Sequence, residues 1–96
     1  MTSEWKTLVD DERGVLKVEF NSGMVFLHVK FRQVMAGMRS AKAMFPTVKE
    51  MLRGMGYKRI HVIIPEGDDA LYRFERYFGF RDVRRIGGHI LMEQEC

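Results

Sequence analysis

The sequence contains a single cysteine, Cys96, which has no partner for an internal disulfide. A chain without disulfides is typical of a reducing compartment, so we expect it to act in the cytoplasm. It also lacks an apolar run long enough to span a membrane, because the longest runs, such as residues 60–64, contain a histidine or end at a proline. We therefore expect no membrane role.

Clusters of residues that carry catalytic or metal chemistry are also missing. No group of histidines and cysteines has the spacing of a metal site, so no metal is expected. Neither a Gly-x-Ser-x-Gly motif nor a cysteine–histidine arrangement supports covalent catalysis. The net charge of +3 is small for a nucleic-acid-binding protein, so this interpretation ranks third and nucleic acid is not favoured as a partner.

The apolar pattern indicates one α/β (α+β) domain over residues 1–96. Two β-rich runs, 15–20 and 24–31, flank Asn21-Ser22-Gly23, which is typical of a hairpin, and residues 5–9 precede them as a shorter strand. Apolar residues then recur at steps of three and four from Val34 to Met55, which predicts a helix with a kink or break at Pro46.

The second half of the chain repeats the alternation of strand and helix. The run at 60–64 is typical of a central strand that is buried on both faces and parallel to the strand before it. Asp68 or Asp69 is expected to cap the next helix, and Gly79 to end it. A last hairpin around Gly87-Gly88 completes a mixed sheet in the order βββ-α-β-α-ββ.

The segment Asp68-Asp69-Ala70-Leu71-Tyr72-Arg73-Phe74-Glu75-Arg76-Tyr77-Phe78-Gly79-Phe80 resembles part of a known family. It is similar to the run of Asn, a small residue, aromatic-Tyr and Gly-Phe that closes the second core helix of the GNAT acyl-CoA N-acyltransferases. The chain thus resembles a truncated GNAT-like core without the family's first strand and first two helices. Residues 39–93 also resemble, in spacing, small acetyltransferase-like proteins of short-tailed bacteriophages, some of them internal virion proteins.

The resemblance implies an acetyl-CoA site after the first hairpin. In the family, a Gly-rich loop presents backbone N–H groups to the CoA pyrophosphate at the N-terminus of a helix. The corresponding residues here are Arg32, Gln33, Gly37, Met38, Arg39 and Ser40. Arg39 stands where the family has a small residue, and its long side chain either holds phosphates away or binds one through its guanidinium. His61 lies in the strand that the family splays from its neighbour to admit pantetheine.

An active member needs a base for the amine, an N–H for the oxyanion and an acid for the leaving thiolate. Glu19 and His28, on adjacent expected strands, are the candidate bases or members of a water chain. Glu75 stands where the family has its general-acid tyrosine. Each of these residues also has a purely structural interpretation. Glu19 would be a solvated strand residue, His28 a partly buried hairpin histidine, and His61 a core histidine with its hydrogen bonds satisfied.

These departures favour a divergent GNAT-like domain with eroded catalytic motifs, and the resemblance to bacteriophage proteins implies that it is phage-encoded. It would act as a binding or virion-associated module in the host cytoplasm, together with a protein partner. The alternative is a working acetyl-CoA-dependent N-acetyltransferase that binds acyl-CoA. Fold alone does not decide between the two.

Overall fold

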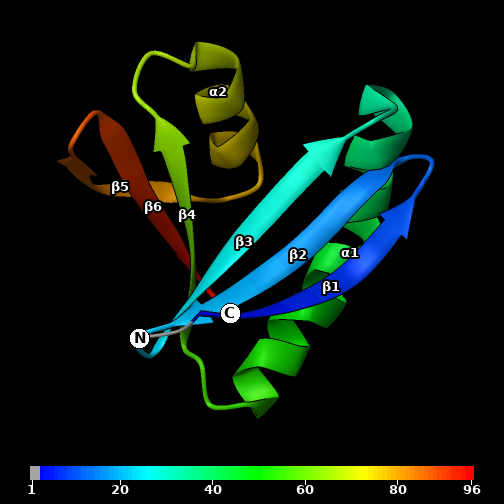
Figure 1. The fold of residues 1–96 in the computed structure, drawn as a ribbon, viewed down its shortest axis with the longest axis horizontal. Helices are drawn as coiled ribbons and strands as arrows, with labels where there is room; N and C mark the ends of the chain where they lie inside the picture. The colour runs from blue at the N-terminus through cyan, green and yellow to red at the C-terminus, as the bar shows by residue number, and fades with distance from the viewer. Residues whose placement is uncertain (1–2) are drawn as a thin grey trace.

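The computed structural model describes residues 3–96 and contains one six-stranded mixed sheet with two helices (Figure 1). The order along the chain is the predicted one, and the strands lie in the order β1-β2-β3-β4-β6-β5. The elements are β1 Glu4–Asp11, β2 Gly14–Asn21, β3 Met24–Phe31, α1 Val34–Gly54, β4 Arg59–Pro65, α2 Asp69–Tyr77, β5 Arg81–Ile86 and β6 His89–Glu95.

Two-residue turns connect both predicted hairpins. Ser22 and Gly23 join β2 to β3 with φ of 54° and 77°, and Gly87 and Gly88 join β5 to β6 with φ of 54° and 80°. Positive φ at both turn positions matches the twist of the flanking strands, which is why glycine is found there. β3 and β4 are parallel neighbours, as expected for strands joined through a helix.

α1 is one unbroken helix in spite of Pro46. Its buried stripe includes Phe45, Val48 and Leu52, and burial of this stripe outweighs the one backbone hydrogen bond that proline cannot make. The helix ends at Gly54, and Gly56 adopts a left-handed φ of 96° directly after it.

The predicted signals for α2 are confirmed at both ends. The Asp68 side chain accepts a hydrogen bond from the Leu71 N–H at 3.1 Å and so caps the helix. At the other end Gly79 has a φ of 98°, which lets the chain fold back and places Phe80 in the core with 1% exposure.

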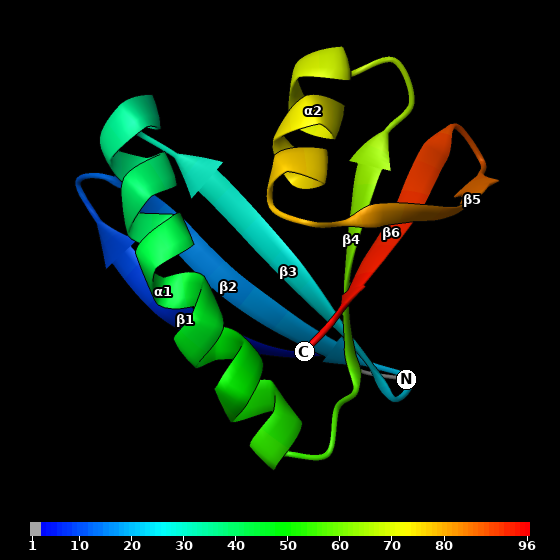
Figure 2. The same cartoon turned by 180° about the vertical axis from the view of Figure 1, so that it is seen from behind.

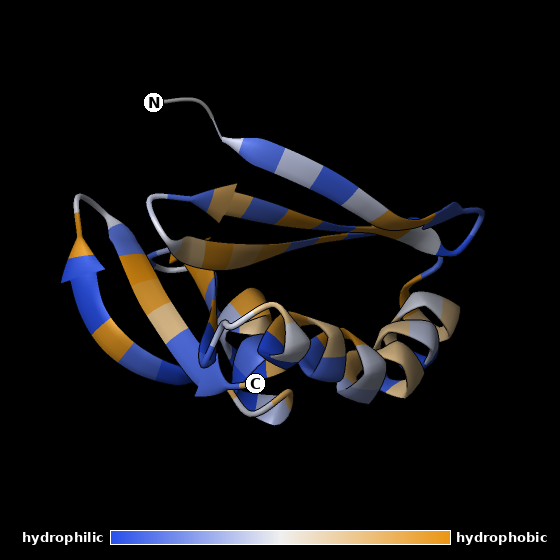
Figure 3. Cartoon of the chain, turned by 90° about the horizontal axis from the view of Figure 1, so that it is seen from below, coloured by the Kyte–Doolittle hydropathy of each residue, from blue (hydrophilic) through white to orange (hydrophobic). Residues whose placement is uncertain are grey.

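Both helices pack on the same face of the sheet (Figures 2 and 3). The core combines the inward strand residues Val18, Val25 and Ile60 with the α1 stripe, and the Phe45 ring of α1 meets the Phe78 ring after α2 at 5.7 Å. No helix within residues 3–96 is long and apolar enough to cross a membrane.

The opposite face of the sheet carries no helix, which corrects one expectation. β4 was predicted to be buried on both faces, but only Ile60, Val62 and Ile64 are buried, while Ile63 is 53% exposed. The reason lies in the tertiary structure. Because α1 and α2 both cover the same face of the sheet, alternate residues of β4 point to the opposite face, which no helix covers. We call this surface the bare face.

Candidate functional site

The residues predicted from the sequence to form a site lie around the point where β3 and β4 separate. The two strands are in register at a single position, Phe26 opposite His61, and they diverge toward their C-terminal ends (Figure 1). α1 begins at the end of β3, and α2 lies beside the end of β4. The ends of the two strands therefore diverge in the shape of a V, and we call this part of the sheet the V.

Three of the predicted residues share one row on the bare face. Glu19, Phe26 and His61 are register partners on β2, β3 and β4, and His28 lies one position further along the same face of β3. The His28 Nε2 lies 2.9 Å from Glu19 Oε1. Hydrogen bonds from Ser3 and His28 lower the pKa of Glu19, so this carboxylate remains charged and is a weak proton acceptor.

His61 makes a second histidine–carboxylate pair in the same row. Its Nε2 lies 3.5 Å from Glu93 Oε2, and its ring is 5.8 Å from the Phe26 ring. The Nδ1 is buried and has no hydrogen-bond partner within residues 3–96. Glu93 also lies 3.9 Å from Arg59 and 4.0 Å from Arg81, so its charge is balanced from two sides. His61 therefore faces the bare side of the sheet at the base of the V.

Glu75 lies on the opposite, helix-covered side. It is the buried residue of α2, with 4% exposure, and one of its carboxyl oxygens has no partner among the described residues. Burial among apolar side chains raises its pKa to about 7, because the charged form loses hydration without gaining a partner. A carboxyl that titrates at this pH is suited to proton transfer.

The cavity beside Glu75 is small. It measures about 10 Å³ and lies between β3, α1 and α2, with Leu27, Phe45 and Phe74 among its walls. This volume is at the lower limit for one water molecule. The Phe31 and Phe74 rings meet edge to face at 5.2 Å and narrow the space between β3 and α2.

The two sides of the sheet thus divide the candidate catalytic residues. Glu19, His28 and His61 gather on the bare face, and Glu75 lies under the helices. The sequence order does not reveal this, because Glu75 belongs to a helix whose orientation depends on packing. It also gave no sign of Glu93, which reaches His61 through the antiparallel pairing of β4 and β6.

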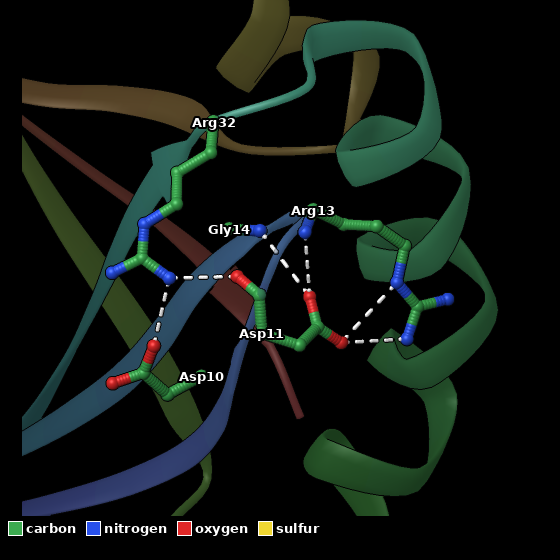
Figure 4. Close-up of polar contacts among 5 residues, drawn as sticks. All are labelled: Asp10, Asp11, Arg13, Gly14 and Arg32. Carbon is green, nitrogen blue, oxygen red and sulfur yellow. Dashed lines mark hydrogen bonds and ion pairs between the residues drawn. The ribbon is translucent and has the colours of Figure 1, made fainter.

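The loop between β3 and α1 is held by the turn between β1 and β2 (Figure 4). The backbone N–H groups of Arg32 and Gln33 both donate to the Arg13 carbonyl oxygen, at 3.0 and 3.1 Å. The Arg32 guanidinium donates to the Asp10 carboxylate at 2.8 Å and to the Asp11 carbonyl at 2.6 Å. The two amides that would begin a phosphate-binding loop therefore already have an acceptor.

Asp11 fixes the turn that supplies this acceptor. Its carboxylate accepts hydrogen bonds from the Arg13 side chain at 2.7 Å and from the Arg13 and Gly14 backbone N–H groups at 2.8 and 3.3 Å. The Arg13 hydrogen bonds lower the pKa of Asp11, so the carboxylate stays ionised at neutral pH. The turn is thus a stable structural feature beside the loop.

The remaining predicted cofactor residues lie inside α1. Gly37, Met38, Arg39 and Ser40 all belong to the helix, and Arg39 is exposed. Gly37 is buried, and a Cβ on it would lie 2.5 Å from the Phe31 ring and 2.8 Å from the Arg13 carbonyl oxygen. Its lack of a side chain therefore lets α1 pack closely against β3 and the β1–β2 turn.

The first turn of α1 is the one part of this region that is suited to an anion. No side chain caps it, and it contains no acidic residue. The first N–H groups of a helix have no partner within the helix, and the helix dipole is positive at this end. The N–H groups of this turn, unlike those of Arg32 and Gln33, are therefore not held by the Arg13 carbonyl oxygen.

No family model and no curated protein matches the sequence. Solved structures do resemble it. The PaiA N-acetyltransferase from Thermoplasma acidophilum, in complex with coenzyme A, superposes with a TM-score of 0.72 at 12% identity, over 86% of this chain and 53% of that one. A GNAT-family acetyltransferase from Listeria monocytogenes gives a TM-score of 0.70 at 15% identity, over 88% and 58%.

A third structure, from Agrobacterium tumefaciens and described as an acetyltransferase, gives a TM-score of 0.63 at 21% identity, over 99% of this chain and 75% of that one. The chain spans little more than half the length of the first two structures, 53% and 58%. Identities this low establish the fold alone. The chain therefore has the fold of the GNAT acetyltransferases.

Proposed function

We propose that this chain is a GNAT-like binding module with eroded catalytic motifs rather than a working acyltransferase. The main support is the β1–β2 turn, whose Arg13 carbonyl accepts hydrogen bonds from both Arg32 and Gln33. A pyrophosphate that used these amides would have to displace two backbone hydrogen bonds and the pairs that Arg32 makes with Asp10 and Asp11. Each lost backbone bond removes about 0.5–1.5 kcal/mol of stability.

The division of the candidate catalytic groups supports the same proposal. A direct transfer needs the amine, the thioester carbonyl and the proton donor within reach of one another. Here Glu75 faces a cavity of about 10 Å³, while Glu19 and His28 face the other side of the sheet. That cavity has no room for the thioester end of a pantetheine arm.

A protein is the proposed partner, and the bare face is its proposed contact surface. Trp5, Ile63 and Ile86 are 53%, 53% and 48% exposed, although such side chains are usually buried. Exposed apolar side chains with polar ones around them, as on this face, are typical of an interaction surface. The resemblance to phage proteins supports a phage-encoded, virion-associated role that begins in the host cytoplasm.

The second candidate function is acetyl-CoA-dependent N-acetylation, and Glu75 is the observation that favours it. Its pKa of about 7 would let the protonated carboxyl pass its proton to the thiolate as the carbon–sulfur bond breaks. The amine nitrogen would form the new bond to the acyl carbon and lose its proton to His28 through a chain of water molecules. The uncapped first turn of α1 would hold the phosphates.

Titration with acetyl-CoA separates the two functions. Calorimetry and a thermal-shift assay on the whole chain should show a dissociation constant of roughly 0.1 mM or weaker. If acetyl-CoA bound tightly, a concentration of about 100 times its dissociation constant would stabilise the fold by about 2.7 kcal/mol. The thermal-shift assay would detect this readily. Arg73→Glu serves as a control for the change in net charge caused by Arg39→Glu, because both residues are exposed.

Micromolar binding that Arg39→Glu abolishes and Arg73→Glu preserves would overturn the proposal. It would show that the start of α1 binds the cofactor in spite of the β1–β2 turn. Acetylation of a small amine that is lost in Glu75→Gln would then establish the second function.

A further inference from the structure

A groove on the helix-covered side lies away from the V and belongs to no part of the proposed cofactor site. It runs between α1 and the C-terminal ends of α2 and β6, and its volume is about 430 Å³. This volume is within the range of small-molecule sites, which is about 300–1,000 Å³. Its first α1 residue, Lys42, lies eight positions beyond Val34, about 12 Å along the helix from the uncapped turn.

Three cations line the α1 side of the groove. Lys42, Lys49 and Arg53 are spaced by seven and four residues, which places them on one stripe of the helix. None of them forms an ion pair with an acidic side chain within residues 3–96, whereas other basic residues such as Arg13 and Arg85 do. No acidic side chain in the described part of the chain lines the groove. The charged side chains that line the groove are therefore all positive.

A neutral acceptor holds Lys49 in place. Lys49 donates to Gln94 Oε1 at 3.0 Å, and the Gln94 Nε2 donates to the Phe78 carbonyl oxygen at 2.9 Å. Gln94 is 8% exposed, so this chain of hydrogen bonds is anchored in the core. An ammonium group has three donors, which leaves two on Lys49 for a ligand.

The far wall is aromatic. Lys42 donates to the Tyr77 hydroxyl and lies 4.5 Å from the centre of its ring. Tyr77 is 65% exposed, and the Phe78 ring lies 6.1 Å from it. Arg53, at the other end, donates to the main-chain oxygen of Cys96 at 3.2 Å. A ligand would thus meet positive charge on one side and flat apolar surface on the other.

We propose that this groove binds a small organic phosphate that carries a ring. The phosphate lies against Lys49 and Arg53, and the ring lies against Tyr77. A phosphate is favoured because its charge and several oxygens match cations with unused donors. This site is independent of whether acetyl-CoA binds at the V.

A titration with AMP, followed by nuclear magnetic resonance on the ¹⁵N-labelled whole chain, tests the proposal. The largest shifts are expected at the backbone amides of Lys49, Tyr77 and Gln94. Lys49→Glu should weaken binding at least about tenfold, since one charge–phosphate contact becomes a repulsion, and the matched reversal Arg73→Glu should change it less than about twofold. Inorganic phosphate should bind at least about tenfold more weakly than AMP, because it has no ring.

The same spectra report whether each variant is folded. Lys42→Gln, which removes a charge of the groove where Lys49→Glu reverses one, is a milder second variant. Three results would overturn the proposal. The first is that AMP shifts only residues 34–36 at the start of α1. The second is equal binding by Lys49→Glu and Arg73→Glu. The third is an affinity that rises steeply from AMP to a six-nucleotide oligomer, which would assign the groove to a nucleic acid strand.

Discussion

Glu75→Gln is expected to stabilise the protein at neutral and alkaline pH and to change little in acid. Glu75 is buried with one carboxyl oxygen unpaired, and burial raises its pKa from 4.5 to about 7. Above that pH the folded protein holds a charge that has lost its water and gained no partner. Glutamine has nearly the same shape and is neutral at every pH, so it removes this charge and leaves the packing unchanged.

The pH dependence follows from the proton balance. Between pH 4.5 and about 7 the unfolded chain has lost the Glu75 proton and the folded chain keeps it, so the free energy of unfolding falls as the pH rises. Each unit of difference between the two pKa values corresponds to about 1.36 kcal/mol of unfolding free energy, so the total loss is about 3 kcal/mol. Above neutral pH, the free energy of unfolding of the wild type is therefore about 3 kcal/mol lower than that of Glu75→Gln.

Urea denaturation gives the unfolding free energy of wild type and of variant at about pH 4 and about pH 8.5. The effect is the change, from one pH to the other, in how far these two free energies differ. Other titrating groups cancel in that difference. Glu50→Gln, at an exposed position of α1, is the matched control for the loss of one carboxylate. If the stability difference for Glu75→Gln is the same at both pH values, the carboxyl is hydrated in the folded state and the argument for its raised pKa is wrong.

Two further substitutions test the close packing of α1 and the cap of α2. Gly37→Ala should destabilise the protein by about 1–3 kcal/mol, because its methyl group would collide with the Phe31 ring and the Arg13 carbonyl oxygen. Gly54→Ala, where a Cβ meets nothing within 4 Å, is the control, and an equal loss in both would refute the packing argument. Asp68→Ala should lower the unfolding free energy by about 0.5–2 kcal/mol through loss of the α2 cap, and an unchanged urea midpoint would show that this cap contributes nothing.

The sequence by itself determined the parts of the fold that depend on near neighbours. Ser22-Gly23 and Gly87-Gly88 mark the hairpins because their turn geometry needs positive φ. The Asp68 cap involves a residue three positions away, so local chemistry is enough to predict it. The order and the type of the elements follow from such signals, together with the spacing at which apolar residues recur.

Only the tertiary structure decided which residues share a site. The order of elements does not say that both helices cover one face, and this choice leaves Ile63 exposed and separates Glu75 from Glu19. Lys49 and Gln94 meet across 45 positions of the chain. The Arg13 carbonyl reaches the loop after β3 because β1 and β2 fold back beside it. Contacts of this kind depend on how whole elements pack, and no local pattern in the chain encodes them.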